Sequence, residues 1–533
     1  MNHTFDYVII GAGSAGCVLA NRLSADGKTS VALLEAGARD WNPWIHVPVG
    51  YFKTMHNPST DWCYSTEPDP GLNGRSLKWP RGKVLGGSSS INGLLYVRGQ
   101  RQDYDQWAES GCFGWSYEQV LPYFKRAENQ ARGEDDYHGI DGPLRVSDMN
   151  FKRPICDDFI KGVSEMGTPI NDDINGESAE GVGYFQLTAH KGRRCSSAVA
   201  YLNGARSRPN LTIFTHTMVK KILFNNNRAT SVKTVRKGTP IKFDARNEVV
   251  LSAGAIGSPQ ILQVSGIGPG ALLQSLGVDL VADSPQVGEN LQDHLQIRTV
   301  YKTHRPITLN DELANPIQKA RAGIQYVLNR TGPLSMAASQ AYAFCKTRLA
   351  NERPDIQYHF QPFSADTPGE GLHPFSAVTA SVCQLRPESR GSVHIKSADI
   401  DEHPTITPNY LSTDLDCRTA VEAVRFTRAI MQTTAMKQHV KSEVLPDPAA
   451  STDDELLDQA RDIANTIYHP TSTCRMGADP DSSVLDPELK VRGVAGLRVV
   501  DASVMPEIVS GNTNAPTIMI AERASDLILA DRK

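Results

Sequence analysis

One histidine in the last quarter of the chain lies in a setting that could support catalysis. His469 stands in "IYHPTSTCRMG", directly before Pro470 and five residues before Cys474. A neutral imidazole has an ordinary pKa of about 6.5, so near neutral pH it can act as a general base. A zinc site built on His469 and Cys474 is disfavoured, because it needs four ligands and no second pair stands nearby at ligand spacing. A packed histidine remains open from this segment alone.

A glycine fingerprint near the start of the chain predicts a dinucleotide site. Residues 5–10 form an apolar, β-branched run typical of a buried strand, and Gly11, Gly13 and Gly16 follow in G-x-G-x-x-G spacing. Gly11 allows the tight turn, Gly13 lets a pyrophosphate approach the backbone, and Gly16 lets the helix pack on its strand. Glu35 ends a second apolar run, where it can accept a hydrogen bond from a ribose hydroxyl. The fingerprint does not separate NAD from FAD.

Similar strand–turn–helix units recur in the middle and at the end of the chain. Residues 249–268 read as a strand followed by a helix, with Ser258 and Pro259 as its N-cap and first helical position. Residues 497–500 read as a strand that ends at Asp501, and residues 517–529 as a helix. Their spread indicates one nucleotide-binding domain that is discontinuous in sequence.

Composition narrows the class of protein. The chain has 533 residues, of which 40% are hydrophobic and 21% charged, as is usual for a globular protein. Its net charge of -4 gives no positive field of the kind that would indicate nucleic-acid binding. No apolar run reaches the ~20 residues that span a bilayer. The first predicted strand follows only "MNHT", which leaves no room for a signal peptide. The nine cysteines are scattered along the chain, which indicates reduced thiols. A cytoplasmic protein is expected, with peripheral attachment to the inner face of the cytoplasmic membrane left open.

Four motifs together resemble one enzyme family. They are "GKVLGGSSSINGLLYVRGQRQDYD", "GAIGSPQILQVSGIG", "YHPTSTCRMG" and "GNTNAPTIMIAE", and with the glycine fingerprint they span nearly the whole chain in the expected order. The chain resembles the glucose-methanol-choline (GMC) oxidoreductases, which oxidise alcohols with FAD. Within the family it looks most similar to bacterial choline dehydrogenases and membrane-associated aliphatic alcohol dehydrogenases.

The resemblance implies an α/β fold, α+β overall, of two parts. A Rossmann-type FAD-binding domain would comprise residues 1–155, 213–295 and 462–533. A substrate-binding domain, an antiparallel sheet flanked by helices, would comprise residues 156–212 and 296–461. Three alternating, strand-like stretches between residues 353 and 397 support such a sheet, and residues 315–335 look like a helix near the pocket entrance.

The resemblance also implies a reaction. His469 matches the family's active-site histidine and would remove the hydroxyl proton of a primary alcohol, while hydride passes to flavin N5. Asn512 would position the alkoxide, and His294 is expected to be structural. Electrons would go to a quinone or another carrier. An oxygen-using alcohol oxidase, a choline dehydrogenase and, more distantly, a hydroxynitrile lyase remain alternatives. An uncharged alcohol is the favoured substrate, and the oligomeric state is left open.

The cofactor set follows from the same motifs. Some family members attach FAD covalently through a histidine just before the asparagine of "SSSIN"; that position is Ile91 here, so non-covalent FAD is expected. Val84, Asn92 and Leu95 would lie along the flavin and Val219 at the adenine. Beside Gly11, Gly13, Gly16 and Glu35, the expected cofactor contacts are Ser14, Ala15, Ala36, Val84, Gly87, Asn92, Gly93, Leu95, Val219, Ala253, Tyr468, Asp501, Ala502, Asn514 and Thr517.

Overall fold

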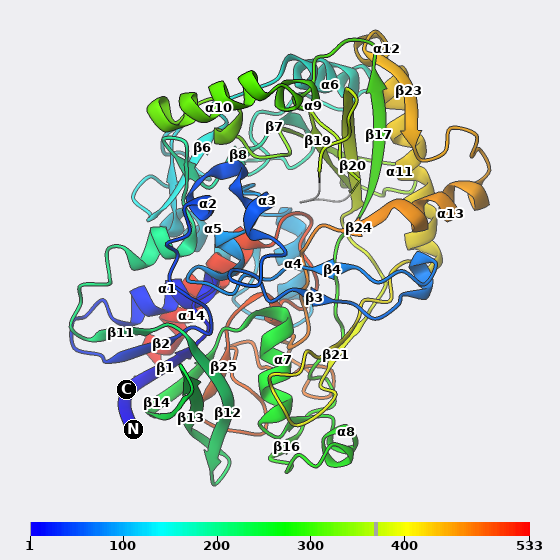
Figure 1. The fold of residues 1–533 in the computed structure, drawn as a ribbon. Helices are drawn as coiled ribbons and strands as arrows, with labels where there is room; N and C mark the ends of the chain where they lie inside the picture. The colour runs from blue at the N-terminus through cyan, green and yellow to red at the C-terminus, as the bar shows by residue number, and fades with distance from the viewer. Residues whose placement is uncertain (1, 367–370, 533) are drawn as a thin grey trace.

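The computed structural model describes residues 2–366 and 371–532 (Figure 1). Two seven-stranded sheets dominate it, and Figure 1 places one at each end of the molecule. The strands of the first sheet are β11 (Leu211–Phe214), β2 (Val31–Leu34), β1 (Asn2–Ile10), β14 (Thr239–Leu251), β13 (Arg228–Arg236) and β12 (Thr217–Asn225), in that order, with β25 (Leu497–Val499) paired to β14.

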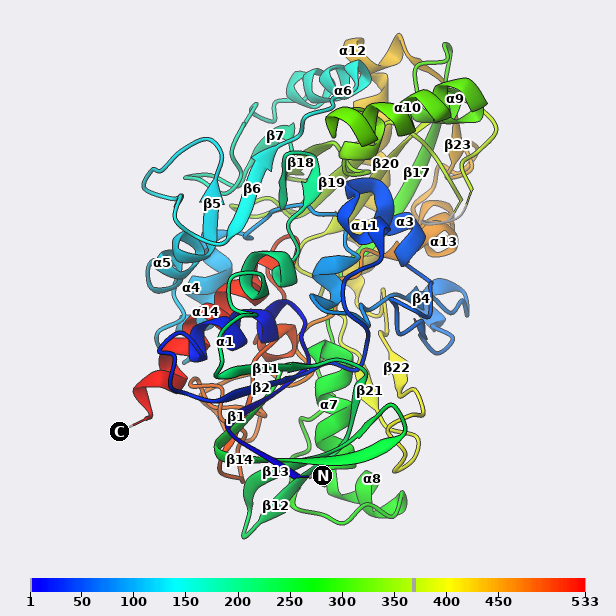
Figure 2. The ribbon, with the colours of Figure 1, turned by 60° about the vertical axis from the view of Figure 1, so that its left-hand side comes forward.

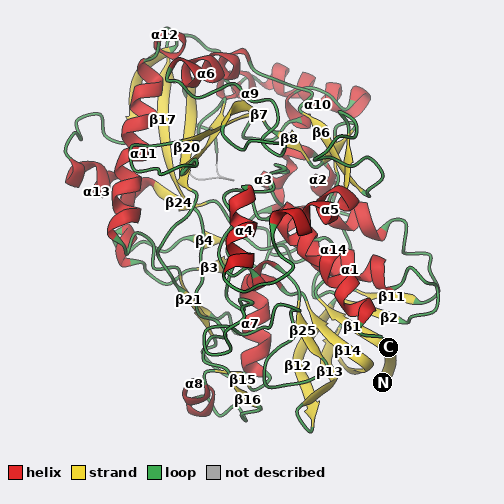
Figure 3. Cartoon of the chain, turned by 180° about the vertical axis from the view of Figure 1, so that it is seen from behind, coloured by secondary structure: helices red, strands yellow, loops and turns green. Residues whose placement is uncertain are grey.

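The core of the first sheet is parallel, as the continuous apolar runs predict. β1 pairs in parallel with β2 and β14, and Ile10 stands in register with both Leu34 and Leu251. The carboxyl ends of three strands therefore meet at one edge, where ligands bind in open α/β sheets. Figure 3 shows α1 (Ser14–Leu23) and α14 (Asn514–Ala530) packed together against this sheet.

The second sheet is antiparallel. Together, the two sheets confirm the predicted fold class, which is α/β in the nucleotide-binding part and α+β overall. Its strands are β23 (Val440–Leu445), β17 (Leu295–Thr303), β20 (Ala377–Gln384), β19 (Ile356–Gln361), β18 (Ala341–Cys345) and β7 (Gly181–Tyr184), with β24 (Ala464–Thr466) paired to β17. The helices α11 (Asp414–Gln432) and α6 (Pro154–Glu165) contact its strands. The proposed domain boundaries stay a prediction, since β24 lies inside the segment 462–533 but pairs with this sheet.

Other helices connect and flank the sheets. Figure 2 shows α10 at the outer edge of the molecule, close to the second sheet. None of the helices within residues 2–366 and 371–532 is long and apolar enough to cross a membrane. The remaining helices are α2 (Pro43–His46), α3 (Tyr51–Thr54), α4 (Arg101–Glu109), α5 (Tyr117–Ala127), α7 (Gly254–Val264), α8 (Gly270–Ser275), α9 (Leu309–Ala314), α10 (Pro316–Asn329), α12 (Thr434–Lys437) and α13 (Asp453–Ile463).

The predicted start of α7 is wrong. The helix begins at Gly254, so Ser258 and Pro259 lie inside it rather than at its N-cap. Asp501 stabilises the earlier start, because its carboxylate accepts hydrogen bonds from the Gly254 amide (2.9 Å) and the Ser258 hydroxyl (2.6 Å). Pro259 cannot donate to the carbonyl of Ala255, four residues before it. The Thr473 hydroxyl donates to that carbonyl instead, at 2.7 Å.

One predicted strand belongs elsewhere. "GSVHIKS" contains β21 (Ser392–His394), which pairs with β22 (Thr405–Thr407) in a separate two-stranded sheet and not with the large antiparallel sheet. Its alternation of polar and apolar residues is real, with Val393 buried between two half-buried neighbours. Alternation predicts that a strand forms, but it does not say which strand will pair with it.

Candidate active site

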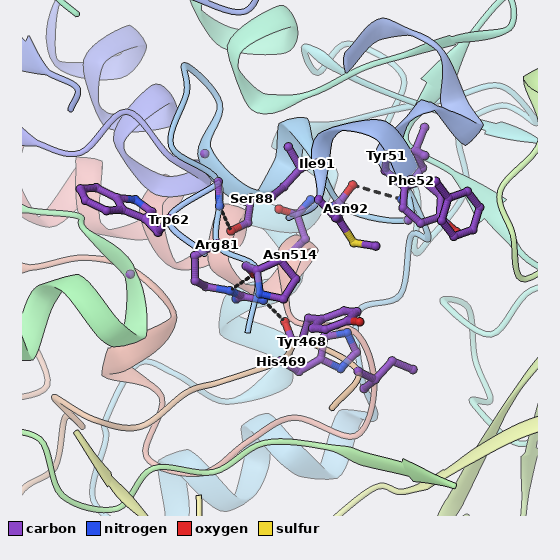
Figure 4. A pocket seen from close by; sticks show the side chains of 18 of the residues that line it. Tyr51, Phe52, Trp62, Arg81, Ser88, Ile91, Asn92, Tyr468, His469 and Asn514 are labelled. Atoms are coloured by element: carbon purple, nitrogen blue, oxygen red, sulfur yellow. Dashed lines mark hydrogen bonds between the residues drawn. The ribbon is translucent and has the colours of Figure 1, made fainter. Parts of the chain in front are cut away.

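A cavity of about 780 Å³ extends from the carboxyl edge of the first sheet to one face of the second. One end is lined by Gly11, Gly13 and Glu35, the other by His469 and Asn512. Figure 4 shows His469 and Tyr468 beside Arg81, whose guanidinium donates to the Tyr468 carbonyl at 2.7 Å. Segments far apart in the sequence therefore share one cavity.

The fingerprint end has the shape that a dinucleotide requires. Gly11 has a φ of +95°, and a Cβ at Gly16 would lie 1.9 Å from the Gly11 carbonyl oxygen, so both positions need glycine. Among the described residues, no side chain caps the N-terminus of α1, so its first-turn amides can bind phosphate. Glu35 accepts from the amides of Ala12 and Gly37, and burial raises its pKa to about 7.

Most of the expected cofactor contacts line this cavity. Gly16 and Val84 do not: Gly16 packs behind Gly11, and Val84 is buried, with its backbone paired to Ala38. Asp501 lines the cavity while its carboxylate holds the start of α7. The other expected contacts that line it are Gly11, Gly13, Ser14, Ala15, Glu35, Ala36, Gly87, Asn92, Gly93, Leu95, Val219, Ala253, Tyr468, Ala502, Asn514 and Thr517.

The ring of His469 is held by a chain of hydrogen bonds that sets its tautomer. His294 Nε2 lies 2.9 Å from the Leu385 carbonyl oxygen, which can only accept, so we assign the proton of neutral His294 to Nε2. His294 Nδ1 is then an acceptor, and His469 Nδ1, 3.0 Å away, must donate to it. His469 Nε2 therefore carries the lone pair. The amide nitrogen of Asn512 lies 3.1 Å from it and donates to it.

Asp293 fixes the backbone of the same histidine. Its carboxylate accepts from the His469 amide at 2.7 Å and from the Thr466 hydroxyl at 2.6 Å, and the Tyr410 hydroxyl also donates to it. Burial raises the Asp293 pKa to about 6, although these donors counteract the rise. The neighbours Asp293 and His294 thus hold the main chain and the ring of His469, respectively.

His469 sits in a desolvated and electropositive setting. It is only 7% exposed, and burial lowers its pKa well below the ordinary value, with His294, His359 and Arg81 lowering it further. His359, on β19, also lines the cavity, and burial lowers its pKa to about 3. His469 is therefore neutral at neutral pH, the form that can accept a proton.

Sequence reasoning missed part of this arrangement. His294 was expected to be structural, yet its ring contacts His469 directly, and Asp293 was not singled out. The available signal was the polar pair inside "ENLQDHL", immediately before the strand β17. His359 had no such signal, because a lone histidine in an alternating strand is most often a packed one.

No metal site accompanies the histidines in the described part of the chain, where no three His, Cys, Asp or Glu side chains are placed to hold an ion. Cys474, which raised the possibility of zinc, is buried, and its amide donates to the Ser503 carbonyl at 2.9 Å. It is a packed neighbour of the site.

Comparisons with known proteins agree with the motifs. Family models of the N-terminal and C-terminal parts of GMC oxidoreductases match residues 5–296 and 387–521. The chain is 43% identical to an alcohol dehydrogenase (acceptor) of Pseudomonas putida over 98% of this chain and 96% of that protein. It is also 43% identical to an oxygen-dependent choline dehydrogenase of Photobacterium profundum, over 100% of this chain and 94% of the relative.

Solved structures show the same fold. Pyridoxine 4-oxidase from Mesorbium loti superposes with a TM-score of 0.89 at 32% identity, covering 98% of both chains. A formate oxidase superposes with a TM-score of 0.93 at 27% identity, covering 100% of this chain and 99% of the other. GMC oxidoreductases are FAD flavoproteins that act on CH–OH donors, and the cavity of this chain has the corresponding nucleotide and histidine ends. The chain belongs to the GMC oxidoreductase family.

Proposed function

We propose that this enzyme oxidises a primary alcohol to the aldehyde, with His469 as the general base. The observation that carries the proposal is the lone pair of His469 Nε2, which the His294 hydrogen bond holds on the side of the cavity-lining Asn512. A hydroxyl group that binds between these two side chains can give its proton to Nε2. Because the imidazole is buried and neutral, it takes up this proton without first losing one.

Asn512 suits the second role, the positioning of the developing alkoxide. Its Oδ1 accepts from Gln357 Nε2 at 3.4 Å, which leaves Nδ2 as the donor toward His469 and a bound hydroxyl. A fixed amide donor stabilises negative charge in a buried site without competing for the proton. FAD, when bound, supplies the hydride acceptor at N5. The nucleotide end, with Glu35 and the uncapped start of α1, would hold its adenosine and phosphates.

An alcohol panel, assayed with oxygen and with an artificial electron acceptor, tests this function. Formation of aldehyde with the artificial acceptor and little hydrogen peroxide would match a dehydrogenase that passes electrons to a quinone or another carrier. Similarity to an alcohol dehydrogenase (acceptor) favours this reading over an oxygen-using oxidase. Similarity to choline dehydrogenases makes choline a necessary member of the panel. Cleavage of a hydroxynitrile without net oxidation would identify a lyase and would contradict the proposal.

We propose that FAD is bound without a covalent bond. Ile91 lines the cavity at the position where some family members carry the linking histidine, and its aliphatic side chain offers no atom that could form such a link. Acid precipitation of the purified protein should therefore release all of its yellow colour into the supernatant. A yellow pellet would show a covalent attachment through another residue.

We also propose that the protein binds a membrane surface through α10. Ala322 and Tyr326 bury one side of this helix, and the Tyr326 hydroxyl donates to the Gly192 carbonyl at 2.9 Å. The opposite side is apolar: Ile317, Ile324 and Leu328 are 79%, 60% and 74% exposed. These three residues share a stripe at helical spacing, whereas a surface helix normally turns such a stripe inward.

Charge points to an anionic bilayer as the partner. Residues 316–330 contain Lys319, Arg321 and Arg330 but no acidic residue, in a chain of net charge -4. A basic helix with an apolar face is typical of binding in the plane of a membrane interface. Lys319 of α10 lines the cavity, as do Leu313 and Ala314 of the preceding helix α9, so α10 lies beside the site. A cytoplasmic location stays a prediction.

Vesicle sedimentation tests this surface. The FAD-loaded protein should bind vesicles that contain phosphatidylglycerol more strongly than vesicles of phosphatidylcholine alone. The double variant Ile324→Ser with Leu328→Ser should bind these vesicles about tenfold or more weakly. Each serine removes most of an aliphatic side chain that the bilayer would otherwise bury. Phe113→Ser, which removes an exposed ring between α4 and α5, is the control and should bind normally. If the double variant still bound vesicles but no longer formed a dimer, a second copy of the chain, and not a membrane, would cover the helix.

A further inference from the structure

Arg298 is a buried cation that faces the cavity without a matching anion. It lies on β17, is 5% exposed, and lines the cavity. Among the described residues, its guanidinium makes one long hydrogen bond, to the Ser381 hydroxyl at 3.4 Å. Its Nε has no hydrogen-bond partner within the part of the chain that the structure describes. Buried guanidinium groups are almost always paired, because desolvating an unpaired charge is costly.

The acidic residues of the cavity do not supply the missing partner. Among the described lining residues, only Glu35 and Asp501 are acidic. Glu35 accepts from two backbone amides at the nucleotide end, and Asp501 holds the start of α7. Tyr468 and Tyr51, both cavity-lining phenols, interact with Arg298, but burial raises the pKa of each, so both stay neutral and neither supplies an anion. Because the guanidinium stays protonated in proteins, this part of the cavity is positive.

Sheet register places this cation at a defined distance from the reacting groups. Arg298 and His359 both pair with Ser381 of β20, from opposite sides. The two residues are therefore separated by one strand, about 10 Å between main chains. His359 follows Gln357 by two residues on β19, and the Gln357 side chain donates to Asn512, so His359 marks the end of the cavity where the hydroxyl would bind. A small molecule can span these two ends.

From this geometry we infer that the substrate is a primary alcohol with a carboxylate at its other end, and that Arg298 binds that carboxylate. The inference rests on the proposed function and refines it, replacing the expectation of an uncharged alcohol. A guanidinium can bind a carboxylate through two parallel hydrogen bonds. Tyr51, Phe52 and Tyr468 provide flat apolar walls for the spacer between the two groups. Arg298 disfavours choline, because a quaternary ammonium would be brought close to a like charge.

The experiment compares matched substrates on the FAD-loaded enzyme. We expect para-(hydroxymethyl)benzoate to have a higher kcat/KM than its methyl ester, and choline to have the lowest. Arg298→Gln should lower kcat/KM for the carboxylate by roughly 30-fold or more, mainly through KM, because a buried charge pair is lost. The same variant should change kcat/KM for the methyl ester far less than for the carboxylate, so that the preference for the carboxylate is lost. Arg298→Lys keeps the charge and should recover part of the loss.

Two results would overturn the inference. One is a wild-type enzyme that prefers the ester; the other is an Arg298→Gln variant that slows both substrates equally, as a structural role would. A binding readout separates this inference from the proposed function. Benzoate should perturb the flavin absorption spectrum at lower concentration than benzamide, and Arg298→Gln should abolish the difference. If benzoate shows this behaviour but no alcohol is oxidised, the proposed function fails and the anion site stands.

Discussion

The variant His469→Ala should reduce its bound flavin about 10²- to 10⁴-fold more slowly than the wild-type enzyme, since that is the usual contribution of a positioned general base. The histidine is buried at the cavity, its Nε2 faces Asn512, and His294 sets its tautomer. Alanine removes the only nitrogen in this chain of contacts that can accept the hydroxyl proton. Rapid mixing with an alcohol in the absence of oxygen measures the effect directly.

The slower flavin reduction in His469→Ala should reflect the reaction itself and not a loss of cofactor or of stability. FAD content and thermal stability should stay close to the wild type, because the nucleotide end of the cavity is formed by other segments. His190→Ala, which changes an exposed histidine on a short hairpin, is the matched control and should react normally. A His469→Ala enzyme with full FAD and a rate within a few fold of wild type would rule out this base.

The pH dependence follows from the direction of the pKa shift. Burial, with His294, His359 and Arg81, holds the pKa of His469 well below 6.5, so the neutral, proton-accepting form persists into acidic solution. Protonation removes activity only as the pH falls through this lowered pKa. The rate of flavin reduction should therefore stay level through pH 6.5 instead of halving there, as it would for an ordinary histidine.

The second large effect is expected at His294. In His294→Leu, the Nδ1 proton of His469 loses its acceptor, so the imidazole can place its proton on Nε2, the wrong nitrogen. Holding a catalytic histidine in the wrong tautomer can cost up to about 10⁴-fold in kcat. We expect a loss in kcat larger than the change in KM, since His294 does not line the cavity.

A positioning role can be told apart from a purely structural one. Because His294 helps to lower the pKa of His469, its removal should move the acid limb of the rate profile to higher pH. His294→Gln, whose amide can accept from His469 or donate to Leu385, should recover part of the rate. An unchanged acid limb, with the rate loss explained by lost FAD or lost stability, would indicate that His294 only supports the fold.

The sequence predicted the parts of this site whose chemistry is local. A strand, three spaced glycines and an acid specify the nucleotide end, because each acts through backbone geometry within its own segment. The start of α7 was mispredicted because Asp501 stabilises it from far along the chain. Asp293 and His294 act on His469 across some 175 residues. Arg298 becomes informative only in the folded structure, where the described lining of the cavity offers it no acidic partner and sheet register gives its spacing from His359.

The claim that this enzyme removes hydride from an alcohol is tested most directly by anaerobic reduction of its flavin. The FAD-loaded enzyme is mixed with a primary alcohol, either unlabelled or deuterated at the carbinol carbon, and the flavin absorbance is followed. We predict that the alcohol bleaches the flavin and that deuteration slows the bleaching, because the carbon–hydrogen bond breaks as the flavin is reduced. A spectrum that no alcohol changes, carboxylate-bearing or neutral, would contradict the proposed function.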